Sequence, residues 1–307
     1  MNAKLVIAVV GPTAIGKTKL AIALAQHYKT EILSADSRQF YKEMQIGTAV
    51  PSTEELEAVK HHFIQHKSIF ETYSVGDFEK EAISKLNELF KNNDVAVVVG
   101  GSGLYVDAVA NGLDDFPKVA PEIREKLKME LKTKGIISLQ KRLKELDAEY
   151  YKKVALENPH RIIRALEICL GTGKPYSSFL NQKKNSRNFK TVYIGLQAER
   201  EIIYNRINQR VELMMNEGLL QEAQQLYAHR NLNALQTVGY KELFNFIDHK
   251  WPLDTAIEEI KKNTRRFAKR QLTWYRKNAT IFWVDFDLEQ KKVIDSFDKY
   301  LETVLNE

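Results

Sequence analysis

The chain has 307 residues, enough for about two domains and a substantial buried core. Hydrophobic residues make up 44% and charged residues 28%, a balance that is typical of globular proteins and excludes a disordered chain. The longest apolar runs are far shorter than the roughly 20 residues that span a bilayer, so we expect no membrane partner. The single cysteine, Cys169, and the lack of a signal-peptide pattern favour a cytoplasmic protein. The net charge of +6 permits a polyanionic partner without requiring one.

Short β-rich runs alternate with helical patterns at residues 5–10, 31–35, 95–99, 191–196 and 281–285. This alternation predicts an α/β fold with a parallel sheet flanked by helices. The stretch between the third and fourth runs shows helical patterns and no convincing strand, which predicts an inserted all-helical domain. We therefore expect a core domain from residues 1–112 and 190–307, and a helical insertion domain from residues 113–189.

Three helices are expected in the insertion domain. The first begins after Pro121, the second carries leucines on one face between Leu139 and Leu146, and the third runs from Asn158 to about Gly171. Beyond the insertion, residues 199–227 predict a helical segment that is interrupted near Gly218. A long helix is then expected from Asp254, acting as its N-terminal cap, to about Lys277.

The strongest motif joins the first strand to the first helix, where residues 11–18 read Gly-Pro-Thr-Ala-Ile-Gly-Lys-Thr. This P-loop pattern directs backbone N–H groups and a helix N-terminus at phosphate oxygens. Lys17 adds a positive charge, and the Thr18 hydroxyl can bind Mg²⁺, the expected cofactor. The motif predicts a P-loop NTPase-like core and a diphosphate or polyphosphate site. The residues expected to bind the phosphate groups are Gly11, Pro12, Thr13, Ala14, Ile15, Gly16, Lys17 and Thr18.

Two further segments follow strands and should reach the same edge of the sheet. Residues 32–35 lead to Asp36, which could act as a general base or help to orient Mg²⁺, although a turn or cap aspartate has the same local sequence. Residues 100–105, Gly-Gly-Ser-Gly-Leu-Tyr, predict a second loop that faces the substrate, although glycines after a strand also form simple turns.

Basic residues gather in three places. Arg206 and Arg210 lie one helical turn apart and could offset the charge of a phosphate leaving group, or could be solvated surface residues. The helix at 261–277 carries many lysines and arginines with interleaved aromatic residues, which suits a nucleic acid and also suits the dipole of the helix itself. The third cluster, His160 to Arg164, begins the last insertion helix.

Further motifs lie along the chain at Tyr41, 46–49, 161–167, 172–175, 238–240, 264–265, 268–271 and 273–274. Together with the P-loop, Asp36-Ser37 and the glycine-rich loop, and in this order, they resemble the tRNA dimethylallyltransferases, also called tRNA isopentenyltransferases. The similarity covers nearly the whole chain. The sequence ends at Glu307 without the zinc finger of eukaryotic members, so the bacterial type is expected.

The resemblance implies a reaction. Family members transfer a dimethylallyl group from dimethylallyl diphosphate to N6 of the adenosine on the 3′ side of the tRNA anticodon, and release diphosphate. It implies that the P-loop holds the diphosphate of the donor, with Thr13, Lys17 and Thr18 at its oxygens or at Mg²⁺. It also implies that Asp36 is the general base and that Arg210 stabilises the leaving group, so the expected catalytic residues are Asp36, Arg210 and Thr13.

The resemblance also implies that both domains bind tRNA, the core domain through its C-terminal helices and the insertion domain at the anticodon arm. The implied tRNA-binding residues are Asp36, Ser37, Arg38, Gln39, Ser102, Arg124, His160, Arg161, Ile162, Ile163, Arg164, Gln236, Thr237, Val238, Gly239, Tyr240 and Lys241. The chain departs from the family pattern at Val50 and Lys241, where many members have lysine and arginine. The expected partners are the anticodon stem-loop of tRNA and dimethylallyl diphosphate, bound by a monomer.

Other functions fit parts of the sequence. An adenylate isopentenyltransferase would prenylate a free nucleotide and would not need the basic helix of the insertion domain. A P-loop small-molecule kinase would use Arg206 and Arg210 as lid arginines and Asp36 to activate a hydroxyl group. A tRNA-binding module without catalysis would leave the P-loop unexplained.

Overall fold

The structure is a computed structural model that describes residues 4–181 and 187–306. Its centre is a six-stranded sheet with the order β3-β2-β4-β1-β5-β6, in which all neighbouring strands are parallel. The strands are β1 (Lys4–Val10), β2 (Ile32–Ser34), β3 (His61–His62), β4 (Val95–Val99), β5 (Phe189–Gln197) and β6 (Phe282–Asp285). The predicted α/β fold class and its five predicted strands are confirmed.

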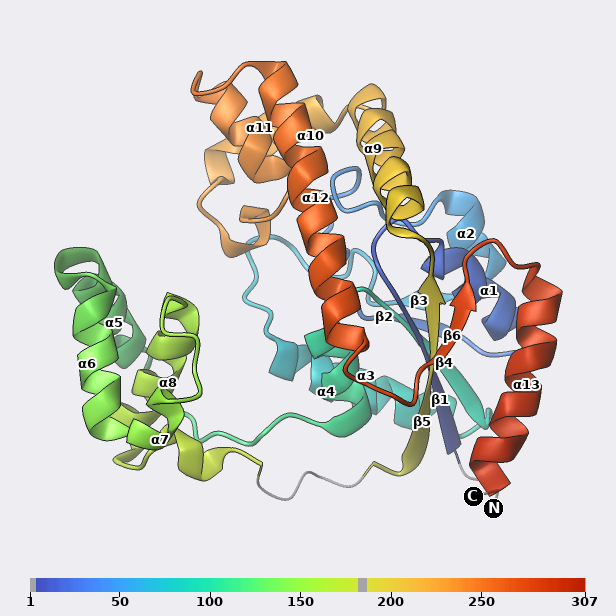
Figure 1. Cartoon of the computed structure of the whole chain (residues 1–307), viewed down its shortest axis with the longest axis horizontal. Coiled ribbons are helices and arrows are strands. Elements are labelled where there is room, and N and C mark those ends of the chain that lie inside the picture. Colours follow the sequence, from blue (N-terminus) through green and yellow to red (C-terminus); the bar gives the residue numbers. More distant parts are fainter. Residues whose placement is uncertain (1–3, 182–186, 307) are drawn as a thin grey trace. The chain divides into compact units, whose positions relative to one another are not determined.

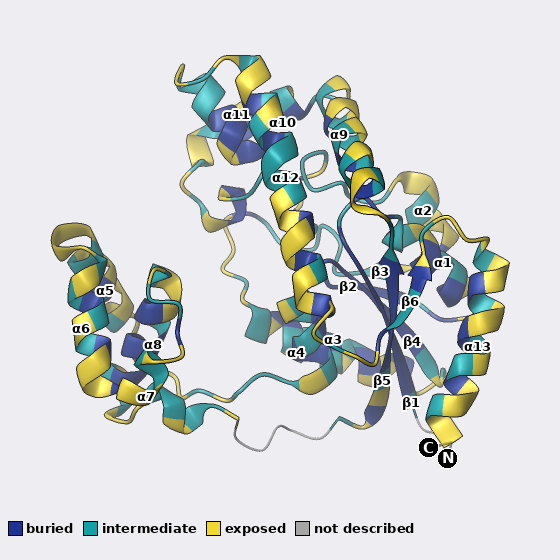
Figure 2. Cartoon of the chain, in the orientation of Figure 1, coloured by how far each residue is buried: buried dark blue, intermediate teal, exposed yellow. Residues whose placement is uncertain are grey.

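Alternate residues of each central strand enter two different cores. In β1, Val6 and Ala8 pack with helices α3 (Val75–Leu89) and α4 (Gly103–Asn111). Leu5 and Ile7 instead pack with α1 (Lys17–His27) and α13 (Gln290–Asn306). Helices therefore cover both faces of the sheet (Figure 1), and the central strands β1, β2 and β4 are almost fully buried (Figure 2). This explains why the strands read as continuous apolar runs in the sequence.

The remaining helices of the core extend beyond the strand ends. They are α2 (Thr53–Ala58), α9 (Arg200–Asn216), α10 (Leu219–Leu226), α11 (Tyr240–Ile247) and α12 (Leu253–Tyr275), with short 3-10 turns at Tyr227–His229 and Asn233–Leu235. Gly218, at φ 103°, separates α9 from α10, as predicted. The prediction that Asp254 caps α12 is wrong, because Pro252 is the N-cap and Asp254 lies in the first turn.

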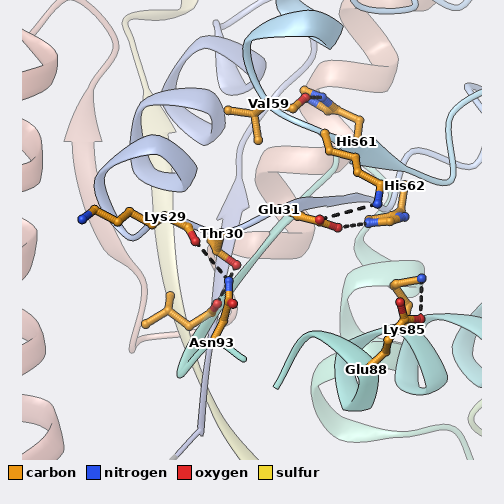
Figure 3. Close-up of polar contacts among 11 residues, drawn as sticks. Lys29, Thr30, Glu31, Val59, His61, His62, Lys85, Glu88 and Asn93 are labelled. Carbon is orange, nitrogen blue, oxygen red and sulfur yellow. Dashed lines mark hydrogen bonds and ion pairs between the residues drawn. The ribbon is translucent and has the colours of Figure 1, made fainter. Parts of the chain in front are cut away.

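The edge strand β3 was not predicted, because it consists of two histidines and has no apolar run. Polar contacts hold this edge in place (Figure 3). The His62 Nε2 atom lies 2.5 Å from a Glu31 carboxylate oxygen, and the His61 Nδ1 atom lies 2.7 Å from the Val59 carbonyl oxygen. A short polar edge strand of this kind is invisible to hydrophobic periodicity.

The chain divides into two compact units. One comprises Met1–Asn111 and Arg187–Glu307, and the other comprises Gly112–Ser186, which places the division within a few residues of the predicted domain boundaries. The second unit holds α5 (Pro121–Lys134), α6 (Ile136–Leu146), α7 (Ala148–Tyr151), α8 (Pro159–Thr172) and a 3-10 turn at Tyr176–Phe179. The prediction of three helices missed α7, a single turn that is too short to show periodicity. The sequence of residues 183–187, Lys-Lys-Asn-Ser-Arg, predicts an exposed loop that leads back into the core domain, and this segment lies outside the described residues except for Arg187.

No helix in the described part of the chain is long and apolar enough to cross a membrane.

Candidate active site

The P-loop backbone is held by side chains from three helices. The Lys17 Nζ atom donates to the Pro12 carbonyl at 2.8 Å. The Arg206 Nε atom of α9 donates to the Ala14 carbonyl at 2.8 Å, and the Gln271 side chain of α12 accepts the Thr13 N–H at 2.8 Å. The loop shape also requires left-handed backbone at Ala14 (φ 64°) and Gly16 (φ 108°). Two peptide units of the loop, Pro12–Thr13 and Ala14–Ile15, are thus held before α1 begins.

A cavity of about 880 Å³ opens in front of this loop, and we call it the P-loop cavity. Lys17 and Thr18 line it from α1, Asp36 lies on its wall after β2, and Arg210 reaches it from α9. Burial lowers the pKa of Lys17 from 10.5 to about 8, an effect that Asp36 opposes and Arg210 reinforces. The first-turn N–H groups of α1 have no partners within the helix, so the cavity combines free donors with positive charge. These properties suit a phosphate or diphosphate group.

The affinity for inorganic diphosphate is expected to depend on the protonation of Lys17. The side chain carries its charge below its pKa of about 8 and loses it above, so the contribution of Lys17 to binding should fall as pH rises from about 7 to about 9. Diphosphate also titrates in this range, so the comparison is with Lys17→Met. Calorimetric titrations should show the affinity difference between the two proteins shrinking with pH, and a difference that stayed constant would contradict this role.

A second cavity of about 670 Å³ lies beside α12, and we call it the α12 cavity. Phe267, Arg270 and Trp274 line it from one face of α12, and the glycine-rich loop after β4 lines it with Gly101 to Tyr105. Phe267 and Trp274 are 38% and 39% exposed, which is unusual for large aromatic residues in a globular protein. Aromatic faces beside an arginine can stack on an unpaired base.

The two cavities share one wall. Its residues are Thr13, Asp36, Thr48, Ala49, Arg210 and Met214. All three predicted catalytic residues, Asp36, Arg210 and Thr13, belong to this set. A ligand in the P-loop cavity and a ligand in the α12 cavity would therefore meet at a carboxylate and a guanidinium.

Asp36 is positioned by the turn that follows β2. One of its carboxylate oxygens accepts the Arg38 N–H at 3.1 Å, and its own N–H donates to the Ser34 hydroxyl at 3.4 Å. The carboxylate interacts electrostatically with both Lys17 and Arg210. This arrangement leaves a carboxylate that can accept a proton at the shared wall, within the electrostatic influence of two cations.

The two arginines of α9 have different surroundings although they lie one turn apart. Arg206 bonds the P-loop carbonyl of Ala14 and stacks on the Phe286 ring, with 5.1 Å between the guanidinium carbon and the ring centroid. Arg210 lines both cavities, and within the described residues it makes no hydrogen bond. Burial lowers the pKa of Arg210, the neighbouring Arg206 adds to this effect, and Asp36 opposes it. Arg206 therefore shapes the loop, whereas Arg210 is available to a ligand.

The residues that follow Asp36 point in different directions. Ser37 and Ser102 lie side by side in the α12 cavity, with 3.2 Å between their hydroxyl oxygens. Arg38 lines the same cavity and donates to the Ala234 carbonyl at 3.1 Å. Gln39 lines the P-loop cavity instead, and its amide donates to the Ala49 carbonyl at 2.8 Å. Gln39 thus supports the shared wall, while the others face the second cavity.

Residues 236–241 form one side of the α12 cavity, except for Tyr240. The Tyr240 side chain is buried, and its hydroxyl donates to Glu222 at 2.6 Å. Glu222 also accepts the N–H groups of Gln45, Ile46 and Gly47, so it fastens the segment that leads into Thr48 and Ala49. Among the predicted tRNA-binding residues, Tyr240 is placed as a support and is not exposed to a ligand.

The predicted residues of the second unit also separate into two groups. His160 and Arg161 are exposed at the start of α8, whereas Ile162 and Ile163 are buried in the core of that unit. Arg124 and Arg164 both pair with the buried Glu167, at 2.7 Å and 3.3 Å. His160 and Arg161 are therefore available to a polyanion, whereas Arg124 and Arg164 are held by their ion pairs with Glu167.

Magnesium fits the chemistry of the P-loop cavity. The Thr18 hydroxyl and the Asp36 carboxylate both line it, and Mg²⁺ in phosphate sites takes one or two protein oxygens together with phosphate oxygens. Within residues 4–181 and 187–306, no group of three or more His, Cys, Asp or Glu side chains could hold a metal ion.

Sequence reasoning missed Gln271 and Glu222 as parts of the site. Gln271 lies on the buried stripe of α12 with Ala268 and Tyr275, where an apolar residue is normal. An amide on an apolar stripe is a signal that the sequence does carry. Glu222, in contrast, is one of many acidic residues on surface helices, and nothing local distinguishes it.

The chain is similar in sequence to proteins of one known family. A sequence model of a family described as IPP transferase matches residues 39–278. A tRNA dimethylallyltransferase of Christiangramia forsetii is 63% identical over 298 residues, covering 97% of both chains. A tRNA dimethylallyltransferase of Flavobacterium psychrophilum is 60% identical over 295 residues, covering 94% of this chain and 96% of the other.

Solved structures give the same relationship. The full-length tRNA isopentenylpyrophosphate transferase of Bacillus halodurans is 37% identical with a TM-score of 0.73, covering 99% of this chain and 97% of the other. A eukaryotic dimethylallyltransferase, studied while acting on tRNA, is 27% identical with a TM-score of 0.84, covering 98% of this chain and 80% of the other. The match extends over both units of the chain.

Proposed function

The chain belongs to the IPP transferase family, and from this membership we propose that it is a prenyl-transferring enzyme acting on tRNA. It transfers a dimethylallyl group from dimethylallyl diphosphate to N6 of the adenosine next to the anticodon on the 3′ side. Diphosphate is the other product. The observation that carries this proposal is the shared wall, where Asp36 and Arg210 border both cavities.

The P-loop cavity is the site of the donor. Lys17 and the first turn of α1 hold the diphosphate, and Thr13 lies at the boundary between donor and acceptor. Thr18 would hold Mg²⁺ on the diphosphate, where the ion would neutralise negative charge. The target adenine enters the α12 cavity after leaving the base stack, which costs least for a single-stranded base such as one in the anticodon loop.

The reaction replaces one bond by another at the allylic carbon. The adenine N6 nitrogen forms a C–N bond while the C–O bond to diphosphate breaks, and the electron pair of that bond stays on the leaving diphosphate oxygen. Arg210 and Lys17 stabilise the charge that develops there. Asp36 accepts the proton that N6 loses, because its carboxylate borders the cavity where the amine would lie.

Residues of both units would contact the tRNA. Ser37, Arg38, Ser102 and the cavity-lining members of 236–241 would contact the target nucleotide and its neighbours. His160 and Arg161 of the second unit would contact phosphates of the anticodon arm. Both cavities are lined by one chain, so a monomer has a complete site, and we place the enzyme in the cytoplasm with its substrate.

A competition assay tests the proposal. The purified protein is incubated with Mg²⁺, isotopically labelled dimethylallyl diphosphate, unmodified tRNA and AMP, and the label is then located. We expect the label in tRNA. Label in AMP would identify an adenylate isopentenyltransferase, whereas phosphate transfer from ATP without prenyl transfer would identify a kinase.

A further inference from the structure

Gln271 is a buried amide that joins two loops of the site. Its side-chain oxygen accepts the Thr13 N–H at 2.8 Å, and its side-chain nitrogen donates to the Gly101 carbonyl at 2.9 Å. Thr13 follows β1 and Gly101 follows β4, which are adjacent strands of the sheet. One side chain of α12 therefore connects the P-loop with the glycine-rich loop of the α12 cavity.

The fit around this amide is tight. A Cβ atom on Gly101 would lie 2.1 Å from the Gln271 nitrogen, so any side chain there would displace the bridge. The same Cβ atom would lie 3.7 Å from the Lys17 Nζ atom. The exposed fraction of Gln271 is 5%, so water cannot readily replace either hydrogen bond.

The bridge also decides which groups of the P-loop remain free. Gln271 takes the Thr13 N–H and Lys17 takes the Pro12 carbonyl of the same peptide unit, while Arg206 takes the Ala14 carbonyl. A loop that is fixed in this way can present its remaining N–H groups to a ligand without paying an ordering cost on binding. Loss of the Thr13 contact would leave the Pro12–Thr13 peptide unit held through its carbonyl alone.

We propose that Gln271 is a positioning residue, which holds the P-loop in the conformation that binds the diphosphate of the donor. This inference rests on the proposed function for the identity of the donor, but its test does not require prenyl transfer. Gln271 lines the α12 cavity but not the P-loop cavity, so it acts on the donor site through Thr13 and Gly101.

The test compares Gln271→Met with Tyr275→Phe. Methionine keeps the length and volume of the side chain and removes both hydrogen bonds. Tyr275 lies one turn further along the buried stripe of α12, and its hydroxyl donates to the Gly100 carbonyl at 3.2 Å. Tyr275→Phe therefore removes a buried bond between the same helix and the same loop without touching the P-loop.

For Gln271→Met, the Kd for inorganic diphosphate in the presence of Mg²⁺ is expected to rise by about tenfold or more, because two buried groups lose their partners. Hydrogen exchange at the peptide that contains Thr13 should become faster, and the Kd for tRNA should stay within about twofold. Tyr275→Phe should lower the melting temperature and leave the diphosphate Kd within about twofold of the wild type.

If Gln271→Met lowered the melting temperature as Tyr275→Phe does but left the diphosphate Kd and Thr13 exchange unchanged, Gln271 would only be a packing residue and the proposal would be overturned. Should Gln271→Met not fold, Gln271→Asn provides the same comparison, because the shorter amide cannot reach both loops. A wild-type protein that binds diphosphate but prenylates no RNA would contradict the proposed function and leave this inference intact.

Discussion

Replacing Asp36 with asparagine is expected to lower kcat for transfer to tRNA by roughly a hundredfold to ten-thousandfold, the usual contribution of a general base. The substitution keeps the size of the side chain and an oxygen that can accept the Arg38 N–H. It removes the proton acceptor at the wall shared by the two cavities. The Kd for tRNA should change little, because one side chain in a large contact surface is altered.

The Asp36→Asn variant also distinguishes two possible roles of Asp36, that of a general base and that of a group that orients Mg²⁺. Asp36 places a negative charge near Lys17 and Arg210, so its removal should leave the affinity for Mg²⁺ diphosphate unchanged or make it higher. Calorimetry with inorganic diphosphate measures this directly. Weaker binding would assign Asp36 to the metal, and a full rate of transfer would end its assignment as the base. Asp254→Asn, on the exposed first turn of α12, is the matched control.

Replacing Arg210 with glutamine is expected to lower kcat by about a hundredfold to a thousandfold, as the loss of a charge that stabilises a transition state does in other enzymes. Arg210 borders both cavities and, within the described residues, has no hydrogen bond that would occupy it. Its charge is therefore available to the leaving diphosphate. Steady-state kinetics with saturating tRNA and donor measures the effect.

Two comparisons make the Arg210 prediction specific. Arg200→Ala, at the start of the same helix, removes an arginine that stacks on Tyr204 and should leave kcat unchanged. Arg210 lowers the pKa of Lys17, so in Arg210→Gln the pH at which Lys17 stops contributing to diphosphate binding should move upward. An unchanged kcat in Arg210→Gln would contradict the leaving-group role.

The sequence was sufficient to predict the sheet and the position of the P-loop between β1 and α1. The strands are buried on both faces, so they appear as apolar runs, and the P-loop pattern lies where a strand meets a helix. Asp36 was placed correctly because a residue directly after a parallel strand must lie at the ligand-binding edge of the sheet. These are local signals, which one segment of sequence carries by itself.

Contacts between distant segments could not be predicted. Arg206 and Arg210 share a helix face, and only their partners show that one supports the P-loop and the other is available to a ligand. Glu222 accepts hydrogen bonds from the backbone of the segment 45–47, which lies more than 170 residues away in the sequence. Tyr240 belongs to a motif that resembles a tRNA contact, but burial against Glu222 makes it a support. Such contacts depend on which distant segments the fold brings together, and no single segment of the sequence shows this.

The most direct test of the account is to map the product. Unmodified tRNA that contains an adenosine 3′ to the anticodon is incubated with dimethylallyl diphosphate, Mg²⁺ and the wild-type protein, then digested and analysed by mass spectrometry. We predict a single dimethylallyl group on N6 of that adenosine, and none with Asp36→Asn under the same conditions. A prenyl group at another position, or an equal yield from Asp36→Asn, would contradict the account.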